Sequence, residues 1–394
     1  MDIPLAPSRR DPVWANWFFR VAICVGLGVL VYFTVESLIK RYPWDLKVYQ
    51  EAMALYLAGH SPYVVGPGMN FVYPPVFLSA FSWAGSHFGH LLLTLYAAGL
   101  TLLARKSMRP VVMGLALFTL TVFFHTRPAV IALGSGNLTF FCHVGLILAW
   151  REGGKMRAWV FPALIVLFST LKPYYLAYAL VPVMVQGLGP AVLVRLTGVV
   201  AVTGMAWVAQ YLADPETFRQ FLAALRMQSF KGEASLLSGD IGWGFYRFLA
   251  PVSGGSANVA LGLHAVLSTL CVGAVMRWRR WLAAWGGRQG VDALGLVALI
   301  VVILVNPRLK IYDYCFIGSM AAYLVAFLLR DCRKIWLILI WLAMHFAEKK
   351  VGPQAVPRFL DAHFLTVVLV ALLVRTGMAK PSAVASESPV EAGR

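Results

Sequence analysis

The chain alternates between long apolar stretches and short polar ones along its whole length. A helix needs about 20 apolar residues to cross a bilayer, and several stretches reach that length while others are shorter. The pattern predicts about twelve helical spans and therefore an all-α polytopic membrane protein. The predicted spans cover residues 17–39, 75–104, 110–124, 129–150, 158–171, 174–186, 190–212, 258–276, 293–305, 313–329, 335–346 and 362–376.

Composition agrees with this pattern. Apolar residues make up 60% of the chain and charged residues 13%, with a mean hydropathy of +0.73, which excludes an ordinary soluble domain. The first span, 17–39, is too long for the apolar core of a signal peptide, so we expect it to remain in the mature protein. We expect residues 17–376 to form a single transmembrane domain between cytoplasmic polar segments at 1–16 and 377–394, the latter disordered.

Charge and cysteine usage exclude two further classes. The net charge is +17, but the cations are dispersed among the spans, which argues against a nucleic-acid-binding module. The five cysteines are scattered without the spacing of a metal site or of a disulfide framework, so neither is suggested. No metal and no cofactor are expected.

The short loops that are richest in Lys and Arg predict the orientation, because such loops stay in the cytoplasm. These loops are 104–109, 151–157, 277–290 and 330–334. Alternation of the spans then puts the first outer loop, 40–74, and a long outer loop, 213–257, on the other side of the membrane. The same side receives the short motifs at 125–137, 171–175 and 306–313.

The first outer loop begins with a predicted amphipathic helix. Residues Leu46, Tyr49, Met53 and Tyr56 recur at helical spacing, which favours a helix lying flat in the membrane interface. Asp45 precedes them and has two compatible interpretations: a cap of the helix, or a fixed carboxylate at the membrane surface.

Several cations are predicted on the same side as Asp45. Lys172 interrupts an apolar region, where it can snorkel to the interface or pair with an anion. Arg308 and Lys310 stand close to Asp313, with which a local salt bridge is the alternative to ligand binding. Lys231 lies in a polar stretch that can simply be solvated. One carboxylate with several cations is the natural complement of an anionic ligand.

Three uncharged residues complete the candidate site. Asn137 follows two glycines at the start of a span, where it can cap the helix or turn its amide toward a ligand. Tyr63 and Tyr73 frame a glycine-rich turn, and they suit either the aromatic belt of the interface or a surface that stacks on a sugar.

Together these motifs resemble the first outer loop and later loops of glycosyltransferase family 87. The matching residues of the first loop are Asp45, Tyr49, Gly59, Pro62, Tyr63, Tyr73, Pro74 and Pro75. The likeness continues in "GSGN" (134–137), "LKPYY" (171–175), "RMQSFKGEAS" (226–235) and "NPRLKIYDY" (306–314). Ser135 and Met227 depart from the family pattern, so the sugar and acceptor are not carried over.

The resemblance implies a GT-C-type bundle and a polyprenyl-phosphate sugar donor that is used at the outer face of the cell inner membrane. It implies Asp45 as the catalytic carboxylate. The chemistry then needs cations for the donor phosphate, and Lys172, Arg308 and Lys310 are available. The remaining candidates for substrate binding are Tyr49, Tyr63, Tyr73, Asn137, Lys231, Tyr312 and Asp313.

The expected reaction moves a mannose- or pentose-type sugar, with inversion, to a lipid-linked or cell-envelope glycan, and Asp45 acts as general base. A lipid or lipid-linked-sugar flippase is the main alternative. Transporters tend to have inverted repeats and charges at mid-membrane, and neither is visible in this sequence. A membrane scaffold without chemistry would need no grouping of an acid with cations.

Overall fold

The computed structural model describes residues 44–63, 71–84, 137–230, 249, 253–254, 256–285 and 288–306. Every regular element within these ranges is helical, in agreement with the predicted all-α class. The elements are α2 (Trp44–Leu57), α3 (Pro75–Ala84), α7 (Thr139–Glu152), η2 (Met156–Val160), α8 (Phe161–Leu171), η3 (Pro173–Ala179), α9 (Leu180–Gln186), α10 (Pro190–Ala213), α11 (Pro215–Phe230), α14 (Ala257–Trp285) and α15 (Arg288–Leu304).

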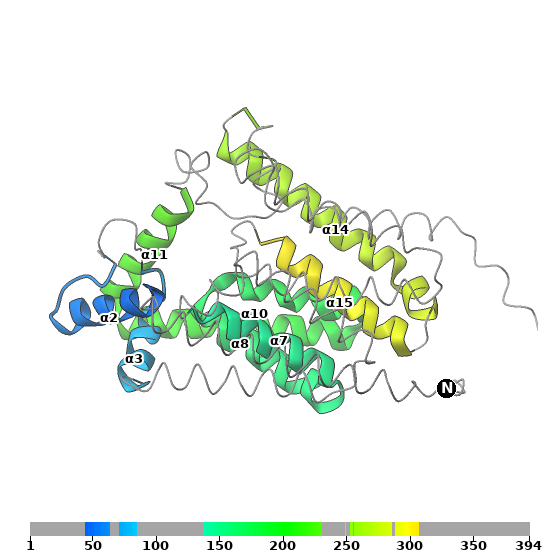
Figure 1. Ribbon diagram of the computed structural model, residues 1–394, viewed down its shortest axis with the longest axis horizontal. Helices are drawn as coiled ribbons and strands as arrows, with labels where there is room; N and C mark the ends of the chain where they lie inside the picture. Colours follow the sequence, from blue (N-terminus) through cyan, green and yellow to red (C-terminus); the bar gives the residue numbers. More distant parts are fainter. Residues whose placement is uncertain are drawn as a thin grey trace, which may run out of the picture.

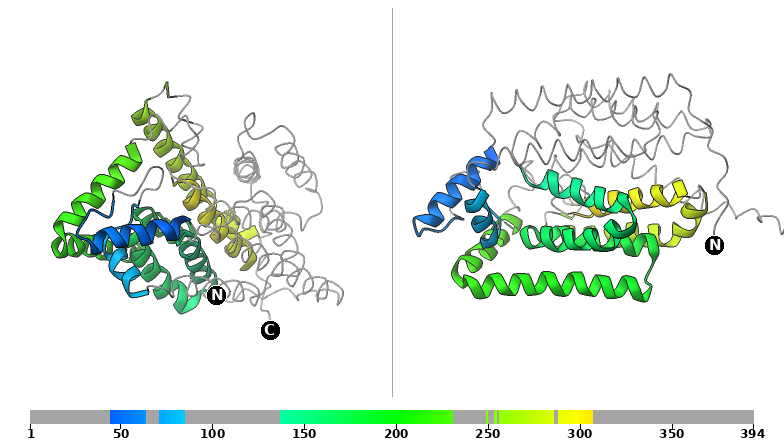
Figure 2. Two further views of the ribbon diagram at one scale, coloured as in Figure 1. Left: turned by 60° about the vertical axis from the view of Figure 1, so that its left-hand side comes forward. Right: turned by 90° about the horizontal axis from the view of Figure 1, so that it is seen from below.

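The described helices form a bundle with a cap at one end. Helices α7, α8, α10 and α15 run side by side, while α2 and α3 lie across one end of them (Figure 1). Helix α11 leaves α10 at this same end, as the two views of Figure 2 also show, and it contacts α3. We call this end, formed by α2, α3 and the start of α11, the α2 end.

Helix α15 is the centre of the main core. Its residues from Leu296 to Leu304 are all buried, so its apolar character on every side is explained by contact with helices all round. Gly295 allows a close approach, because a Cβ atom there would lie 2.5 Å from Nε1 of Trp150. Trp150 itself is buried among the core side chains of α7 and α8.

Helices α10 and α14 expose apolar surface instead of burying it. Two segments, Pro190–Ala213 and Asn258–Arg277, are long and apolar enough to cross a membrane, yet only 17% and 22% of their most apolar windows are buried. Val194 on α10 is 72% exposed. A contiguous apolar surface of this kind is unfavourable in water and favourable in lipid. The two helices are therefore candidate membrane spans, by length, composition and exposure.

This placement predicts different effects for the same charge at two depths. Val202 lies near the middle of α10 and is 45% exposed, whereas Val194 lies one turn from its start. Val202→Arg is expected to disfavour membrane insertion by about 3 kcal/mol, while Val194→Arg can snorkel and is tolerated. A membrane-insertion reporter assay checks this result. Equal tolerance of both substitutions would mean that α10 faces water.

The basic stretch 277–290 still follows the apolar segment Asn258–Arg277, in agreement with the predicted span 258–276, but most of it is helical. Helix α14 continues to Trp285 and α15 begins at Arg288. Arg and Trp side chains are compatible with a helix, and long cationic side chains can extend a span beyond the apolar region. The guanidinium of Arg279 packs against Gly187, where a Cβ atom would lie 1.7 Å from its Nη1.

The expected span 174–186 is also divided. A 3-10 segment, η3, precedes the short helix α9, and Lys172 separates η3 from α8 in an extended conformation with φ −143°. Pro173 occupies the first position of η3, which favours an extended conformation for the residue before it. This break turns the Lys172 side chain out of the helical path.

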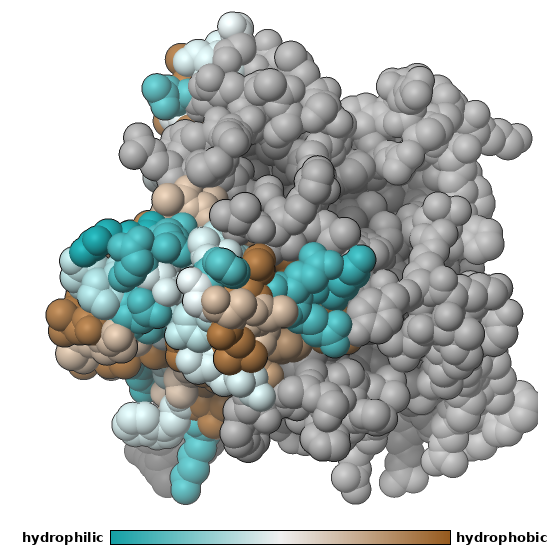
Figure 3. All heavy atoms as spheres, turned by 90° about the vertical axis from the view of Figure 1, so that its left-hand side faces the viewer, coloured by the Kyte–Doolittle hydropathy of each residue, from teal (hydrophilic) through white to brown (hydrophobic). Residues whose placement is uncertain are grey.

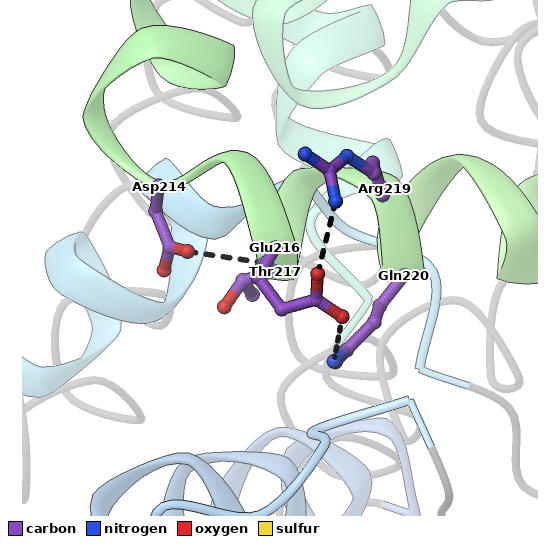
Figure 4. Close-up of polar contacts among 5 residues, drawn as sticks. All are labelled: Asp214, Glu216, Thr217, Arg219 and Gln220. Carbon is purple, nitrogen blue, oxygen red and sulfur yellow. Dashed lines mark hydrogen bonds and ion pairs between the residues drawn. The ribbon is translucent and has the colours of Figure 1, made fainter.

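The segment 213–257, predicted as a long outer loop, contains a helix, α11, whose start is well capped. Oδ1 of Asp214 accepts a hydrogen bond from the backbone N–H of Thr217 at 3.0 Å, and Pro215 occupies the first helical position (Figure 4). Glu216 accepts hydrogen bonds from Arg219 and Gln220 at 3.3 and 3.1 Å, as the same figure shows. The Asp214-Pro215 pair is a sequence signal for the start of a helix, but the polar composition of residues 213–257 favoured a loop.

Candidate functional site

The described residues of the predicted first outer loop begin with helix α2, which ends shortly before a glycine. Helix α2 ends at Leu57, and Gly59 adopts a positive φ of 73° that favours glycine. His60 N–H donates to the carbonyl of Leu55 at 2.9 Å and Gly59 N–H to that of Tyr56 at 3.0 Å. This double closure is the Schellman motif, so Gly59 has a local structural role that requires no ligand.

The predicted amphipathic helix exists, but its apolar face lies on protein. Tyr49 is 1% exposed and makes edge contacts with Tyr73 and Phe77, with ring centroids 5.2 and 4.9 Å apart. Met53 is buried in the same cluster, against which Leu46 and Tyr56 pack. The expectation that this face lies in the membrane interface is therefore wrong. Burial also makes Tyr49 a positioning residue instead of a surface for substrate.

The two tyrosines that frame the glycine-rich turn are connected to each other. The hydroxyl of Tyr63 donates to the backbone carbonyl of Tyr73 at 3.0 Å. The hydroxyls of Tyr73 and Tyr49 are 2.9 Å apart, which fixes the Tyr-Pro-Pro segment on α2. Tyr73 is buried, so it does not belong to an exposed aromatic belt.

Asp45 lies in the first turn of α2, where the helix dipole favours a carboxylate, and it contacts a residue that is distant in the sequence. Its Oδ2 accepts a hydrogen bond of 3.1 Å from Nδ2 of Asn137, which is 92 positions away in the sequence. Oδ1 of Asn137 accepts from the backbone N–H of Thr139 at 2.9 Å. The carbonyl of Asn137 therefore stabilises the start of α7, as the capping interpretation expects, while its amide contacts Asp45.

Lys172 joins the same group from the other side. Its Nζ donates to Oγ1 of Thr139 at 2.8 Å and lies 4.6 Å from the ring centroid of Tyr73. The second contact is a cation–π interaction, which stabilises an ammonium group away from bulk water. Lys172 therefore turns inward onto polar partners, and simple snorkelling does not describe it. We call Asp45, Tyr73, Asn137, Thr139 and Lys172 the Asp45 cluster.

Sequence reasoning did not identify Thr139, although it is the link between the amide and the ammonium. Its carbonyl accepts a hydrogen bond from the hydroxyl of Tyr175 at 3.3 Å, and the hydroxyl of Tyr174 lies 3.5 Å from its Oγ1. From the sequence alone, a threonine at the start of an apolar helix is interpreted as an ordinary packing residue. Its position two residues after Asn137 was the available signal.

Burial controls the ionisation of the tyrosines in this region. It raises the pKa of Tyr73 well above its ordinary value, and the neighbouring Tyr49 and the charge of Asp45 raise it further. The pKa of Tyr63 is also raised, first by burial and then by the negative charge of Asp214. At neutral pH both side chains are uncharged phenols, so Tyr73 offers a hydroxyl and a π face and carries no charge.

These raised pKa values predict a loss of stability in alkali. Because folding favours the neutral phenol, its contribution is complete below the unfolded pKa of about 10 and is lost as pH rises toward the folded pKa. Tyr63→Phe is expected to weaken the dependence of Tm on pH above that value, while costing about 1 kcal/mol at neutral pH through the lost hydrogen bond. Thermal unfolding in detergent across this pH range measures both effects. If the slope of Tm against pH above 10 were the same in Tyr63→Phe as in the unaltered protein, the expectation would be contradicted. Tyr211→Phe, at an exposed position, is the control for the loss of a phenol in general.

The other candidate residues lie outside the described residues: Lys231, Arg308, Lys310, Tyr312 and Asp313. Within the described ranges, no group of three or more His, Cys, Asp or Glu side chains could hold a metal ion.

The Asp45 cluster combines a carboxylate that can accept a proton with an ammonium that can bind an anion. The α2 end exposes hydrophilic and hydrophobic side chains side by side (Figure 3).

Comparison with known proteins gives no match: no protein-family model fits the chain, and no curated protein or solved structure matches it. The geometry of the Asp45 cluster and the chemistry of its side chains therefore carry the functional inference.

Proposed function

We propose that the protein is an integral membrane glycosyltransferase that uses a polyprenyl-phosphate sugar. It moves a mannose- or pentose-type sugar to a lipid-linked or cell-envelope glycan. The main support is the convergence of the Asp45 carboxylate and the Lys172 ammonium through Asn137 and Thr139, from three distant segments. The resemblance of the first outer loop to glycosyltransferase family 87 agrees with this chemistry. In this proposal the chain is a GT-C-type bundle of about twelve spans in the inner membrane, with the α2 end facing outward.

Asp45 acts as the general base. The hydroxyl oxygen of the acceptor attacks the anomeric carbon, the bond from that carbon to the phosphate oxygen breaks, and the hydroxyl proton passes to the carboxylate. Attack from the face opposite the phosphate inverts the anomeric carbon. The amide of Asn137 occupies Oδ2 and orients the group, and a carboxylate has about four lone-pair positions with which to receive further donors.

Lys172 binds the phosphate, which leaves as an anion and needs no strong general acid. The ring of Tyr73 and the hydroxyl of Thr139 hold the ammonium in place. The proposal assigns further phosphate contacts to Arg308 and Lys310. It assigns Tyr63, Lys231, Tyr312 and Asp313 to the sugar or the acceptor, and the apolar surface of the bundle to the polyprenyl tail.

A transfer assay in proteoliposomes tests the proposal against the flippase alternative. The purified protein receives a short-chain polyprenyl phosphate carrying labelled mannose or a labelled pentose, with envelope lipids and glycans as acceptors. The expected result is label in a new glycan and release of polyprenyl phosphate. Movement of intact donor between leaflets without cleavage of the sugar–phosphate bond would refute the transferase and favour a flippase.

A further inference from the structure

A network of polar side chains continues from Lys172 into the interior of the bundle, between α7 and η3. The hydroxyl of Tyr175 donates to the backbone carbonyl of Thr139 at 3.3 Å, and Nδ1 of His143 shares a hydrogen bond with the hydroxyl of Tyr178. The ring of His143 also makes an edge contact with that of Tyr175, with centroids 5.4 Å apart. We call His143, Tyr175 and Tyr178 the His143 network. Each is 1% exposed, so none of them presents a surface to a substrate.

The spacing of the partners matches between the two elements. Thr139 and His143 are four residues apart on an α-helix, which rises about 6 Å over that interval. Tyr175 and Tyr178 are three residues apart on a 3-10 helix, which also rises about 6 Å and places both side chains on one side. In an α-helix the same tyrosines would be only about 4.5 Å apart along the axis and would diverge around it. The 3-10 conformation therefore lets both tyrosines reach α7 at once.

This match also accounts for the length of η3. It has seven residues, whereas 3-10 helices are seldom longer than about four, because their hydrogen bonds have poorer geometry. The two hydrogen bonds to α7 stabilise a conformation that is unfavourable in isolation. The His143 network therefore fixes both the conformation of η3 and its register on α7.

Lys172 is joined directly to this 3-10 helix. It precedes Pro173, the first residue of η3, and its backbone carbonyl accepts a hydrogen bond from the N–H of Tyr175 at 3.2 Å. Its Nζ donates to Oγ1 of Thr139, the residue whose carbonyl accepts from Tyr175. Lysine has a long flexible side chain, so its ammonium is fixed only where the backbone and the partner are both fixed. The register of η3 on α7 therefore sets the position of the ammonium.

We propose that the His143 network positions the Lys172 ammonium for sugar transfer, by fixing η3 on α7. This inference rests on the proposed function. Helix α7 begins just after Asn137, whose amide contacts Asp45, so the network holds both charges of the Asp45 cluster relative to one helix. A role in packing alone would instead affect stability without a selective effect at Lys172.

Acetylation of Lys172 tests the positioning without an assay of activity. The purified protein is treated with N-hydroxysuccinimidyl acetate, and mass spectrometry gives the rate at Lys172 relative to that at Lys47, an exposed lysine. His143→Leu and Tyr178→Phe are each expected to raise this ratio about fivefold, because each removes a buried hydrogen bond. His143→Asn is expected to restore the ratio of the unaltered protein, since asparagine offers a donor and an acceptor near the position of Nδ1.

His264→Leu is the matched control. It removes a second buried histidine, whose Nε2 lies 2.9 Å from the carbonyl oxygen of Val305. This variant is expected to lower Tm without changing the acetylation ratio of Lys172. An equal rise of the ratio in the control would indicate general loosening of the bundle and would overturn the proposal. An unchanged ratio in Tyr178→Phe, which loses only a hydroxyl, would overturn it as well.

Transfer kinetics then separate this inference from the proposed function. His143→Leu and Tyr178→Phe are expected to lower kcat/KM for the lipid donor about fivefold. They should add little in the Lys172→Gln background, because they act through that ammonium. A full additional loss in that background would overturn the positioning role. Changed acetylation with no transfer by the unaltered protein would refute the transferase, and with it the role in transfer, while the link between the network and Lys172 would stand.

Discussion

Asp45→Asn is expected to reduce the turnover number of sugar transfer by about 10²- to 10⁴-fold, the usual contribution of a general base. The amide has the size of the carboxylate, and its oxygen can still accept the hydrogen bond from Asn137 that Oδ2 accepts in the unaltered protein. The variant should therefore fold and keep the cluster in place. Removal of a negative charge near the donor phosphate should leave donor affinity unchanged or slightly improved.

The matched control is Asp214→Asn, at a second carboxylate of the α2 end. Asp214 caps α11 through the N–H of Thr217, and asparagine caps helices equally well. This variant should retain full turnover and stability, so the pair separates a catalytic charge from a structural one. Turnover of the Asp45 variant close to that of the control would remove Asp45 from the reaction, even if donor binding were confirmed.

The sequence predicts the long elements well because their limits are chemically distinct. Helix α10 was expected at 190–212 and occupies Pro190–Ala213, since Gly189 precedes the apolar run and Asp214-Pro215 follows it. The span predicted at 258–276 agrees with the apolar segment Asn258–Arg277, but the continuation of α14 to Trp285 was not predicted, because arginine and tryptophan are permitted both in a helix and in a loop. Periodicity and charge alone do not distinguish these two states.

The sequence identifies members of the Asp45 cluster but not their contacts. Asp45 stands out at the start of a predicted amphipathic helix, and Lys172 because an ionisable group within apolar surroundings needs a partner or hydration. Their connection depends on Thr139, an ordinary residue whose significance comes only from the return of α8 beside α7. The burial of Tyr49 was missed for a related reason, because a face that suits the membrane interface also suits the apolar side of α3.

Lys172→Gln is expected to lower kcat/KM for the lipid donor by about 10²-fold or more, because a preorganised cation at a developing phosphate charge contributes on that scale. Glutamine retains a hydrogen-bond donor but removes the charge that lies on Nζ beside Thr139. Lys47→Gln is the matched control, since Lys47 is an exposed cation two residues from Asp45, paired with Glu51 at 3.6 Å. An exposed pair of this kind contributes little, so the control should remain active.

Combining Asp45→Asn with Lys172→Gln tests whether the two charges work in one site. Residues that act as a unit give strongly non-additive effects, so the double variant should lose little more turnover than Asp45→Asn alone. Full additivity of the two losses would mean that Lys172 supports transfer independently of Asp45, for example by stabilising the fold through Thr139 and Tyr73. Thermal unfolding of the Lys172 variant distinguishes that case. If the role of Lys172 is structural, the variant has a lower Tm without donor. If Lys172 binds the phosphate, Tm without donor is unchanged, and the increase in Tm on adding donor is smaller than in the unaltered protein.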